Sequence, residues 1–190
     1  MGKFIVLTGL DGSGTSTVAE GLHELDINST LLKSPPFPFS TNRHTIDEMV
    51  FHASPQAHYH YYLAANIYLS TIVNKTLTEN DGNIYCQRFF IDTVVSHRAK
   101  GVDAKFEYDT DTHSIRKPDY TFFLDVSEEE RQLRLNERGR GFLDDQLTDE
   151  TLCGNMLREF EALSDHFIRI QTTNRSINEI IAEIQSYIEE

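Results

Sequence analysis

The sequence predicts a three-layer α/β/α fold built on a parallel β-sheet, and two observations support this. Strand-like and helix-like segments alternate along the 190 residues, which is typical of strand–helix–strand units with right-handed crossovers. The first strand-like run, Phe4–Thr8, leads directly into a glycine-rich loop and an amphipathic helix. Ligands of such sheets bind beyond the carboxyl ends of the strands, so the segments that follow the strands are the candidate sites.

The predicted strands are short apolar runs bounded by turn-forming residues. They are Phe4–Thr8, the weaker candidate Ser29–Lys33, Ile84–Cys86, Tyr120–Val126 and Phe167–Gln171. The turn sequence Asn80-Asp-Gly-Asn83 precedes the third strand, and Pro118 precedes the fourth. Three prolines between Ser34 and Ser40 exclude a helix there, because proline lacks a backbone donor and keeps its neighbours extended.

The predicted helices have recognisable starts. They run from the glycine-rich loop to about Asp26, from Pro55 to about Glu79, from Asp92 to Lys100, and onward from Ser127 and Ser176. Ser54 before Pro55 is a cap followed by proline in the first turn. Ser127-Glu-Glu-Glu130 and Ser176-Ile-Asn-Glu179 both match the capping box, and the second opens an isoleucine-striped terminal helix.

Composition narrows the possible functions. Seventeen Lys and Arg against thirty Asp and Glu give a net charge of −13, which argues against general nucleic-acid binding. The length fits a single domain over residues 1–190. Cys86 and Cys153 are predicted to be buried free thiols rather than a disulfide or a metal site. No run of about eighteen apolar residues and no signal peptide is present, so we expect a cytoplasmic protein that does not associate with membranes.

The glycine-rich loop has the form of a phosphate-binding loop with one substitution. Gly9 and Gly14 fall at the spacing of G-x-x-x-x-G-K-[ST], and Ser16 occupies the hydroxyl position that binds Mg²⁺. The lysine position holds Thr15. Successive backbone N–H groups and the positive end of the following helix favour anions here, although a glycine-rich turn without a ligand is the alternative. The predicted phosphate-binding residues are Gly9, Gly12, Ser13, Gly14, Thr15, Ser16 and Thr17.

Five segments, in order over essentially the whole chain, together resemble thymidylate kinase and its P-loop nucleoside monophosphate kinase relatives. They are the N-terminal strand and loop, Gln87-Arg88-Phe89 with Asp92–Val95, Lys117–Val126, Glu137-Arg-Gly-Arg140, and Ile168–Thr172 with the capped helix that follows. The resemblance implies a P-loop kinase fold with a short lid at about residues 136–148. It also implies ATP and Mg²⁺ as cofactors, a nucleotide as small-molecule partner and, from the family's usual assembly, a homodimer.

The departures from this family lie where the chemistry takes place. Thr15 replaces the loop lysine, and Gln87 replaces the acidic residue before the phosphate-binding arginine. Ser34-Pro-Pro-Phe37 stands where Arg-Glu-Pro-Gly is expected, and Asn66-Ile67 stands where an Asp-Arg pair is expected. The loss of two arginines predicts that ordinary thymidylate is a poor acceptor.

Three arginines are candidates for binding phosphate. Arg88 follows a buried strand at its carboxyl end, where its forked guanidinium suits a phosphate or carboxylate. A structural salt bridge is the alternative. Arg138 and Arg140 lie in the predicted lid, where they are candidates for binding the transferring group. An ordinary solvated helix end is the alternative for these two.

Asp11, inside the loop, is a candidate for orienting an acceptor hydroxyl or a metal-bound water, and stabilisation of the turn is the alternative. The predicted acceptor pocket consists of Phe37, Phe39, Asn66, Gln87 and Arg88. Phe37 and Phe39 would wall a base pocket, with aromatic–proline packing as the alternative. His58 and His60 point in different directions on a helix, so they make a poor metal pair and are expected to line a packed helix.

Together these residues predict a nucleotide-binding phosphotransferase that transfers the γ-phosphate of ATP to a nucleoside monophosphate or a similar small acceptor. Its catalytic candidates are Asp11, Arg88, Arg138 and Arg140. The alternative is a degenerate kinase fold that binds a nucleotide as a sensor or partner module. Ser16 and Arg88 favour the enzyme, whereas Thr15 and Gln87 favour the binding module.

Overall fold

The computed structural model describes residues 2–108, 115–138 and 150–189. Within these ranges five strands form one parallel sheet in the order β2-β3-β1-β4-β5. The strands are β1 (Phe4–Thr8), β2 (Thr30–Lys33), β3 (Ile84–Gln87), β4 (Tyr120–Asp125) and β5 (Ile168–Gln171). The predicted α/β fold with a parallel sheet is therefore confirmed.

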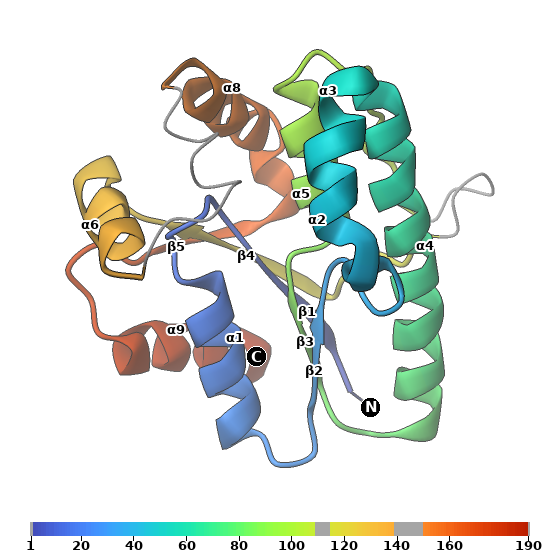
Figure 1. Ribbon diagram of the computed structural model, residues 1–190. Coiled ribbons are helices and arrows are strands. Elements are labelled where there is room, and N and C mark those ends of the chain that lie inside the picture. The colour runs from blue at the N-terminus through green and yellow to red at the C-terminus, as the bar shows by residue number, and fades with distance from the viewer. Residues whose placement is uncertain (1, 109–114, 139–149, 190) are drawn as a thin grey trace.

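Helices cover both faces of the sheet, as Figure 1 shows. The long helices are α1 (Thr15–Leu25), α4 (Pro55–Glu79), α5 (Phe90–Arg98), α6 (Glu128–Arg138), α8 (Glu150–Glu161) and α9 (Ile177–Glu189). A further 3-10 turn, η3 (Ser164–His166), precedes β5. None of the helices in the described ranges has both the length and the apolarity needed to cross a membrane.

The side chains of β1 alternate between the two helical layers, as a two-residue strand period requires. Phe4 and Val6 pack with α4 and α5, whereas Ile5 and Leu7 pack with α1 and α9. All four side chains are fully buried, because β1 lies in the middle of the sheet. A third cluster joins α8 to α5 and to β4, and it brings α8 beside the carboxyl end of the sheet. Both cysteines are free and buried, as predicted.

One helix prediction is wrong. A 3-10 helix, η1 (Phe39–Asn42), begins inside the stretch that the prolines were expected to keep non-helical. The three prolines all precede it, and Pro38 stands at its N-cap, where its fixed φ is compatible with a helical start. Short helical segments then continue through α2 (Arg43–Thr45), η2 (Ile46–Val50) and α3 (Phe51–Ala53). They place this segment beside α4, at the edge of the candidate site.

Candidate functional site

The loop after β1 has the predicted shape. Its turn closes with a hydrogen bond from the Ser13 N–H to the Leu10 carbonyl of 3.0 Å, and α1 begins at Thr15. Gly9 has a φ of 149°, and a Cβ there would lie only 2.6 Å from the Ser13 hydroxyl oxygen, so a side chain is excluded. The Ser13 hydroxyl is buried without a hydrogen-bond partner among the described residues. A loop of backbone donors and one orphaned hydroxyl is suited to binding phosphate.

A cavity of about 810 Å³ opens over this loop, and its volume lies within the usual range for a small-molecule site. Its walls include loop residues from Gly12 to Thr17, together with α6 and the segment before α9. Arg134 donates from Nη1 to the Ser13 carbonyl over 3.3 Å. Arg175 lines the other side. The loop cavity therefore contains cationic side chains although the loop itself has no lysine.

Thr15 and Gln87 are two of the residues at which this chain differs from the family pattern, and the structure shows the surroundings of both. The Thr15 side chain is buried, with 4% of the residue exposed. The Gln87 amide donates a hydrogen bond to the hydroxyl of Ser16. A neutral amide thus lies beside the hydroxyl that the motif assigns to Mg²⁺.

Arg88 connects the loop after β1 to the start of α5. Its Nη1 donates to the Gly9 carbonyl over 2.7 Å and to Asp92 over 3.0 Å, and its Nη2 donates to Asp11 over 2.7 Å. Arg88 also has a φ of 63°, a left-handed conformation that non-glycine residues rarely adopt and that is often found at functional sites. Salt bridges are present, as one sequence interpretation expected, and anion binding by Arg88 stays a prediction.

Asp92 is the buried partner of Arg88. Its carboxylate also accepts from the Thr8 hydroxyl over 2.7 Å and from the Phe89 N–H over 3.0 Å. Burial raises the pKa of Asp92, and the charge of Arg88 opposes that shift. The ion pair therefore stabilises a carboxylate that the protein interior would otherwise disfavour.

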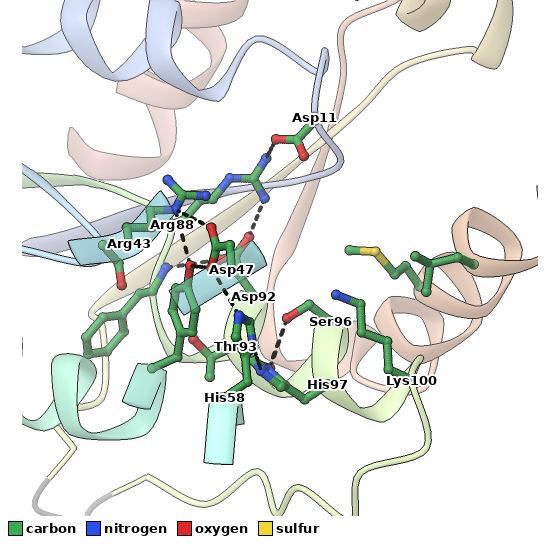
Figure 2. A pocket seen from close by; sticks show the side chains of 15 residues that line it. Asp11, Arg43, Asp47, His58, Arg88, Asp92, Thr93, Ser96, His97 and Lys100 are labelled. Carbon is green, nitrogen blue, oxygen red and sulfur yellow. Dashed lines mark hydrogen bonds and ion pairs between the residues drawn. The ribbon is translucent and has the colours of Figure 1, made fainter. Parts of the chain in front are cut away.

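A second cavity, of about 120 Å³, lies on the other side of Arg88, between α4, α5 and α8 (Figure 2). Asp11 and Arg88 line both cavities. They therefore stand between the loop cavity and this second cavity, which we call the acceptor cavity.

The predicted acceptor pocket requires correction. Phe37 is 76% exposed and lines neither cavity, and Phe39 packs against the rings of Tyr61 and Tyr68. Phe37 therefore faces solvent, and Phe39 serves aromatic packing, which was the alternative for both.

Two polar residues of the predicted pocket also lie outside the acceptor cavity. Asn66 is fully buried, where it accepts from the Ser34 hydroxyl over 3.0 Å and donates to Thr93 over 2.8 Å. Gln87 lines the loop cavity instead. Of the predicted acceptor residues, Arg88 alone is among those that line the acceptor cavity in the described structure.

The acceptor cavity contains polar residues that sequence reasoning missed. Arg43, Asp47, His58, His97 and Lys100 all line it. Arg43 and Asp47 are four residues apart on one helical face, which was the available sequence signal. His58 is buried in the packed helix α4, as expected, but its ring is part of a hydrogen-bonded chain.

This chain links Asp47, His58 and His97. Asp47 Oδ1 lies 3.0 Å from His58 Nε2, and His58 Nδ1 lies 2.7 Å from His97 Nε2. His97 Nδ1 lies 2.6 Å from the Thr93 carbonyl oxygen. The Tyr62 hydroxyl donates to Asp47 over 2.7 Å, and Arg43 Nε lies 3.2 Å from its other oxygen.

The partners of the chain assign its protons. The Thr93 carbonyl only accepts, so His97 carries its proton on Nδ1 and offers the Nε2 lone pair to His58. His58 must then donate from Nδ1 to His97 and from Nε2 to Asp47. Burial opposes the charged form of Asp47, yet hydrogen bonds from His58 and Tyr62 lower its pKa overall.

The hydrogen-bonded chain of Asp47, His58 and His97 predicts that the folded protein loses stability in acid. Burial lowers the pKa of His97 from 6.5 to about 4, so below pH 6.5 the unfolded chain binds a proton that the folded chain excludes. Stability is therefore expected to fall by about 3 kcal/mol between pH 6.5 and pH 4. Urea unfolding across this range should show the loss, and His97→Gln should reduce it. Parallel pH profiles for the two proteins would contradict the assignment.

The predicted lid is not described. Arg138 is the last residue of α6, and its side chain, Arg140 and lid residues 139–148 lie outside the described part of the structure. Their predicted contact with the transferring group therefore stays a prediction.

A parallel sheet with a phosphate-binding loop after its central strand, flanked by a second cavity across Arg88, defines a P-loop kinase. The family model for thymidylate kinase matches residues 7–184, so the chain belongs to the thymidylate kinase family. It is a nucleotide-binding phosphotransferase, as its sequence predicts.

Two curated relatives are similar to this chain in sequence, and one solved structure is similar to it in fold. A thymidylate kinase of Brachyspira hyodysenteriae is 26% identical over 149 residues, which cover 75% of this chain and 72% of that protein. The "Probable thymidylate kinase" of Halorubrum lacusprofundi is 27% identical over an aligned span of 198 residues, covering 98% and 97%. The solved thymidylate kinase of Candida albicans superposes with a TM-score of 0.76 at 23% identity, over 99% of this chain and 91% of that one.

Proposed function

We propose that this protein transfers the γ-phosphate of ATP to a small phosphorylated acceptor that is not ordinary thymidylate. The observation that carries the proposal is the position of Asp11 and Arg88, which line both the loop cavity and the acceptor cavity. A group at that junction can contact donor and acceptor phosphates together. Phosphoryl transfer depends mainly on such positioning and on positive charge.

The loop cavity suits the donor. Backbone N–H groups at the start of α1, the orphaned Ser13 hydroxyl and the cation of Arg134 together suit a phosphate chain. Arg134 Nη1 lies 3.7 Å from the point that a Cβ on Gly14 would occupy, so the guanidinium lies against the loop. It supplies positive charge that Thr15 does not. Ser16 would contribute one oxygen to Mg²⁺, with phosphate oxygens and water as further ligands.

The acceptor cavity suits an anionic group near Arg88. Arg43 lines the same cavity, and its charge and that of Arg88 both lower the pKa of Lys33 at the end of β2, behind the larger effect of burial. Three cations therefore gather at this edge of a protein whose net charge is −13. Such local clustering is what an acidic protein needs in order to bind a phosphorylated acceptor.

A nucleotide-binding module without turnover is the second candidate. Thr15 removes the lysine that would contact the transferring phosphate, and Gln87 removes a carboxylate beside Ser16. The acceptor cavity, at about 120 Å³, is also below the usual range for a site that holds a whole nucleotide.

Steady-state turnover separates these functions. With ATP and Mg²⁺, we expect the purified protein to phosphorylate thymidine monophosphate far more slowly than the roughly 1–100 per second of ordinary kinases. Release of ADP should be measured against a panel of monophosphates and small phosphorylated acids, with Arg88→Ala as control.

The outcomes are distinct. Turnover of any acceptor that is lost in Arg88→Ala supports the proposal. ATP binding without turnover of any acceptor favours the binding module. Thymidylate turnover at an ordinary rate contradicts the altered acceptor site.

A further inference from the structure

Lys100 is a partly buried cation with no function in the site described so far. It lines the acceptor cavity just beyond the end of α5. Its ammonium lies over the Phe51 ring, 3.7 Å from the centroid. Within the described ranges, no carboxylate or carbonyl accepts a hydrogen bond from it. Burial lowers its pKa to about 8, and the negative charge of Asp47 opposes that shift only in part.

Lys100 lies at the end of the acceptor cavity away from Arg88. Arg88 and Lys100 both line this one cavity, and they come from opposite ends of α5. In Figure 2, Arg88 and Asp11 lie at the top, the Asp47–His58–His97 chain runs downward from Arg88 along one side, and Lys100 lies across from that chain beside Ser96. A molecule held at Arg88 would extend along the chain toward Lys100.

The polar side chains that line the cavity near Lys100 already have hydrogen-bond partners within the protein. Asp47 accepts from three donors, and both ring nitrogens of His58 and of His97 have partners. The Ser96 hydroxyl donates to the Thr93 carbonyl over 3.2 Å. The far end therefore presents mainly N–H donors from Lys100. A nucleobase edge that alternates donors and acceptors would leave its own N–H unpaired there, whereas an ionised carboxylate only accepts.

We infer that the phosphoryl acceptor is a small molecule with two anionic ends, a phosphate held at Arg43 and Arg88 and a carboxylate held by Lys100. This inference rests on the proposed function, whose acceptor it specifies. The ammonium and carboxylate form a charge-assisted pair, which is stronger than a bond to a neutral carbonyl. A cavity of about 120 Å³ suits a short linear or single-ring body between the two ends.

A ladder of ω-phosphonocarboxylates tests the inference without depending on turnover. Each member of increasing chain length is paired with the alkylphosphonate of equal length, and binding to the full chain is measured by calorimetry. At the length that spans the cavity, we expect the phosphonocarboxylate to bind at least about 10-fold more tightly than the alkylphosphonate, which lacks the carboxylate. This advantage should disappear in Lys100→Met and survive in part in Lys100→Arg.

Lys105→Met is the matched control, because Lys105 is exposed outside the cavity. It should keep the full advantage, and circular dichroism should confirm that the variants fold. Equal binding of both probe series at every length, or an advantage that survives in Lys100→Met, would overturn the inference while leaving the proposed function intact. If neither series binds at any length, the anion site at Arg88 also fails.

Discussion

Arg88→Ala is expected to weaken acceptor binding and to destabilise the fold. The change removes the cation that the acceptor phosphate would contact and leaves the buried carboxylate of Asp92 without its ion pair. Loss of charged hydrogen bonds worth roughly 1.5–3 kcal/mol each should weaken binding of a phosphorylated acceptor by about 10²-fold. Removing one partner of a largely buried pair should cost about 3 kcal/mol of stability.

The pH dependence of this cost follows from Asp92. Without Arg88, burial raises the pKa of Asp92 further, so the folded variant binds a proton that the unfolded chain releases. The stability difference between wild type and variant should therefore shrink as pH falls from 7 toward 4. Urea unfolding of both proteins at each pH measures that difference directly, because other titrating groups largely cancel.

Arg169→Ala provides the matched control. Arg169 also pairs with two carboxylates, those of Asp125 and Glu161, but it is 39% exposed and lines neither cavity. Exposed pairs contribute about 0–1 kcal/mol, so this variant should stay close to wild type in stability. Comparable losses in both variants, or unchanged phosphate binding in Arg88→Ala, would mean that Arg88 is an ordinary structural arginine.

The fold was predictable because its signals are local. The strands are apolar runs separated by turn residues, and β1 with its loop carries a glycine pattern that has few other uses. Gly9 must approach the chain closely, and Gly14 has a φ of 96°. These requirements act on single positions or on neighbours in sequence, so the sequence reveals them directly.

The wall of the acceptor cavity was not predictable in the same way. Asp47, His58 and His97 come from three separate helical segments, and their hydrogen bonds join residues 11 and 39 positions apart. Nothing local in the sequence requires these side chains to converge. The segment after the prolines also lacks a clear apolar period, so its short helices and the position of Arg43 depend on packing against α4.

Thr15→Lys is expected to tighten binding of ATP with Mg²⁺ and, if charge at the loop limits the reaction, to raise turnover by about 10²-fold. A lysine at the first position of α1 would restore the ammonium that the loop motif directs at the β- and γ-phosphates. One charge-assisted hydrogen bond contributes roughly 1.5–3 kcal/mol, so affinity should rise by about 10- to 100-fold. Calorimetric titration of both proteins with ATP and Mg²⁺ measures this change.

A second substitution, Gln87→Asp, tests the effect of charge near Mg²⁺ separately from the effect of charge near the phosphates. Gln87→Asp places a carboxylate beside the Ser16 hydroxyl, which the Gln87 amide now contacts. We expect it to strengthen Mg²⁺ dependence, and to add to Thr15→Lys if the two residues act on different partners. Thr78→Lys, on the exposed surface of α4, adds the same charge far from the loop and controls for the attraction of ATP to a less acidic protein.

The comparison of the lysine variants identifies the role of Thr15. A gain in Thr15→Lys that Thr78→Lys does not share places residue 15 beside the phosphates, and it means that Arg134 compensates only in part for the missing lysine. Equal affinity in wild type and Thr15→Lys, with the fold intact, would mean that Thr15 does not face the β- and γ-phosphates. Tighter binding with no turnover of any acceptor would place the block at the acceptor cavity rather than at the loop.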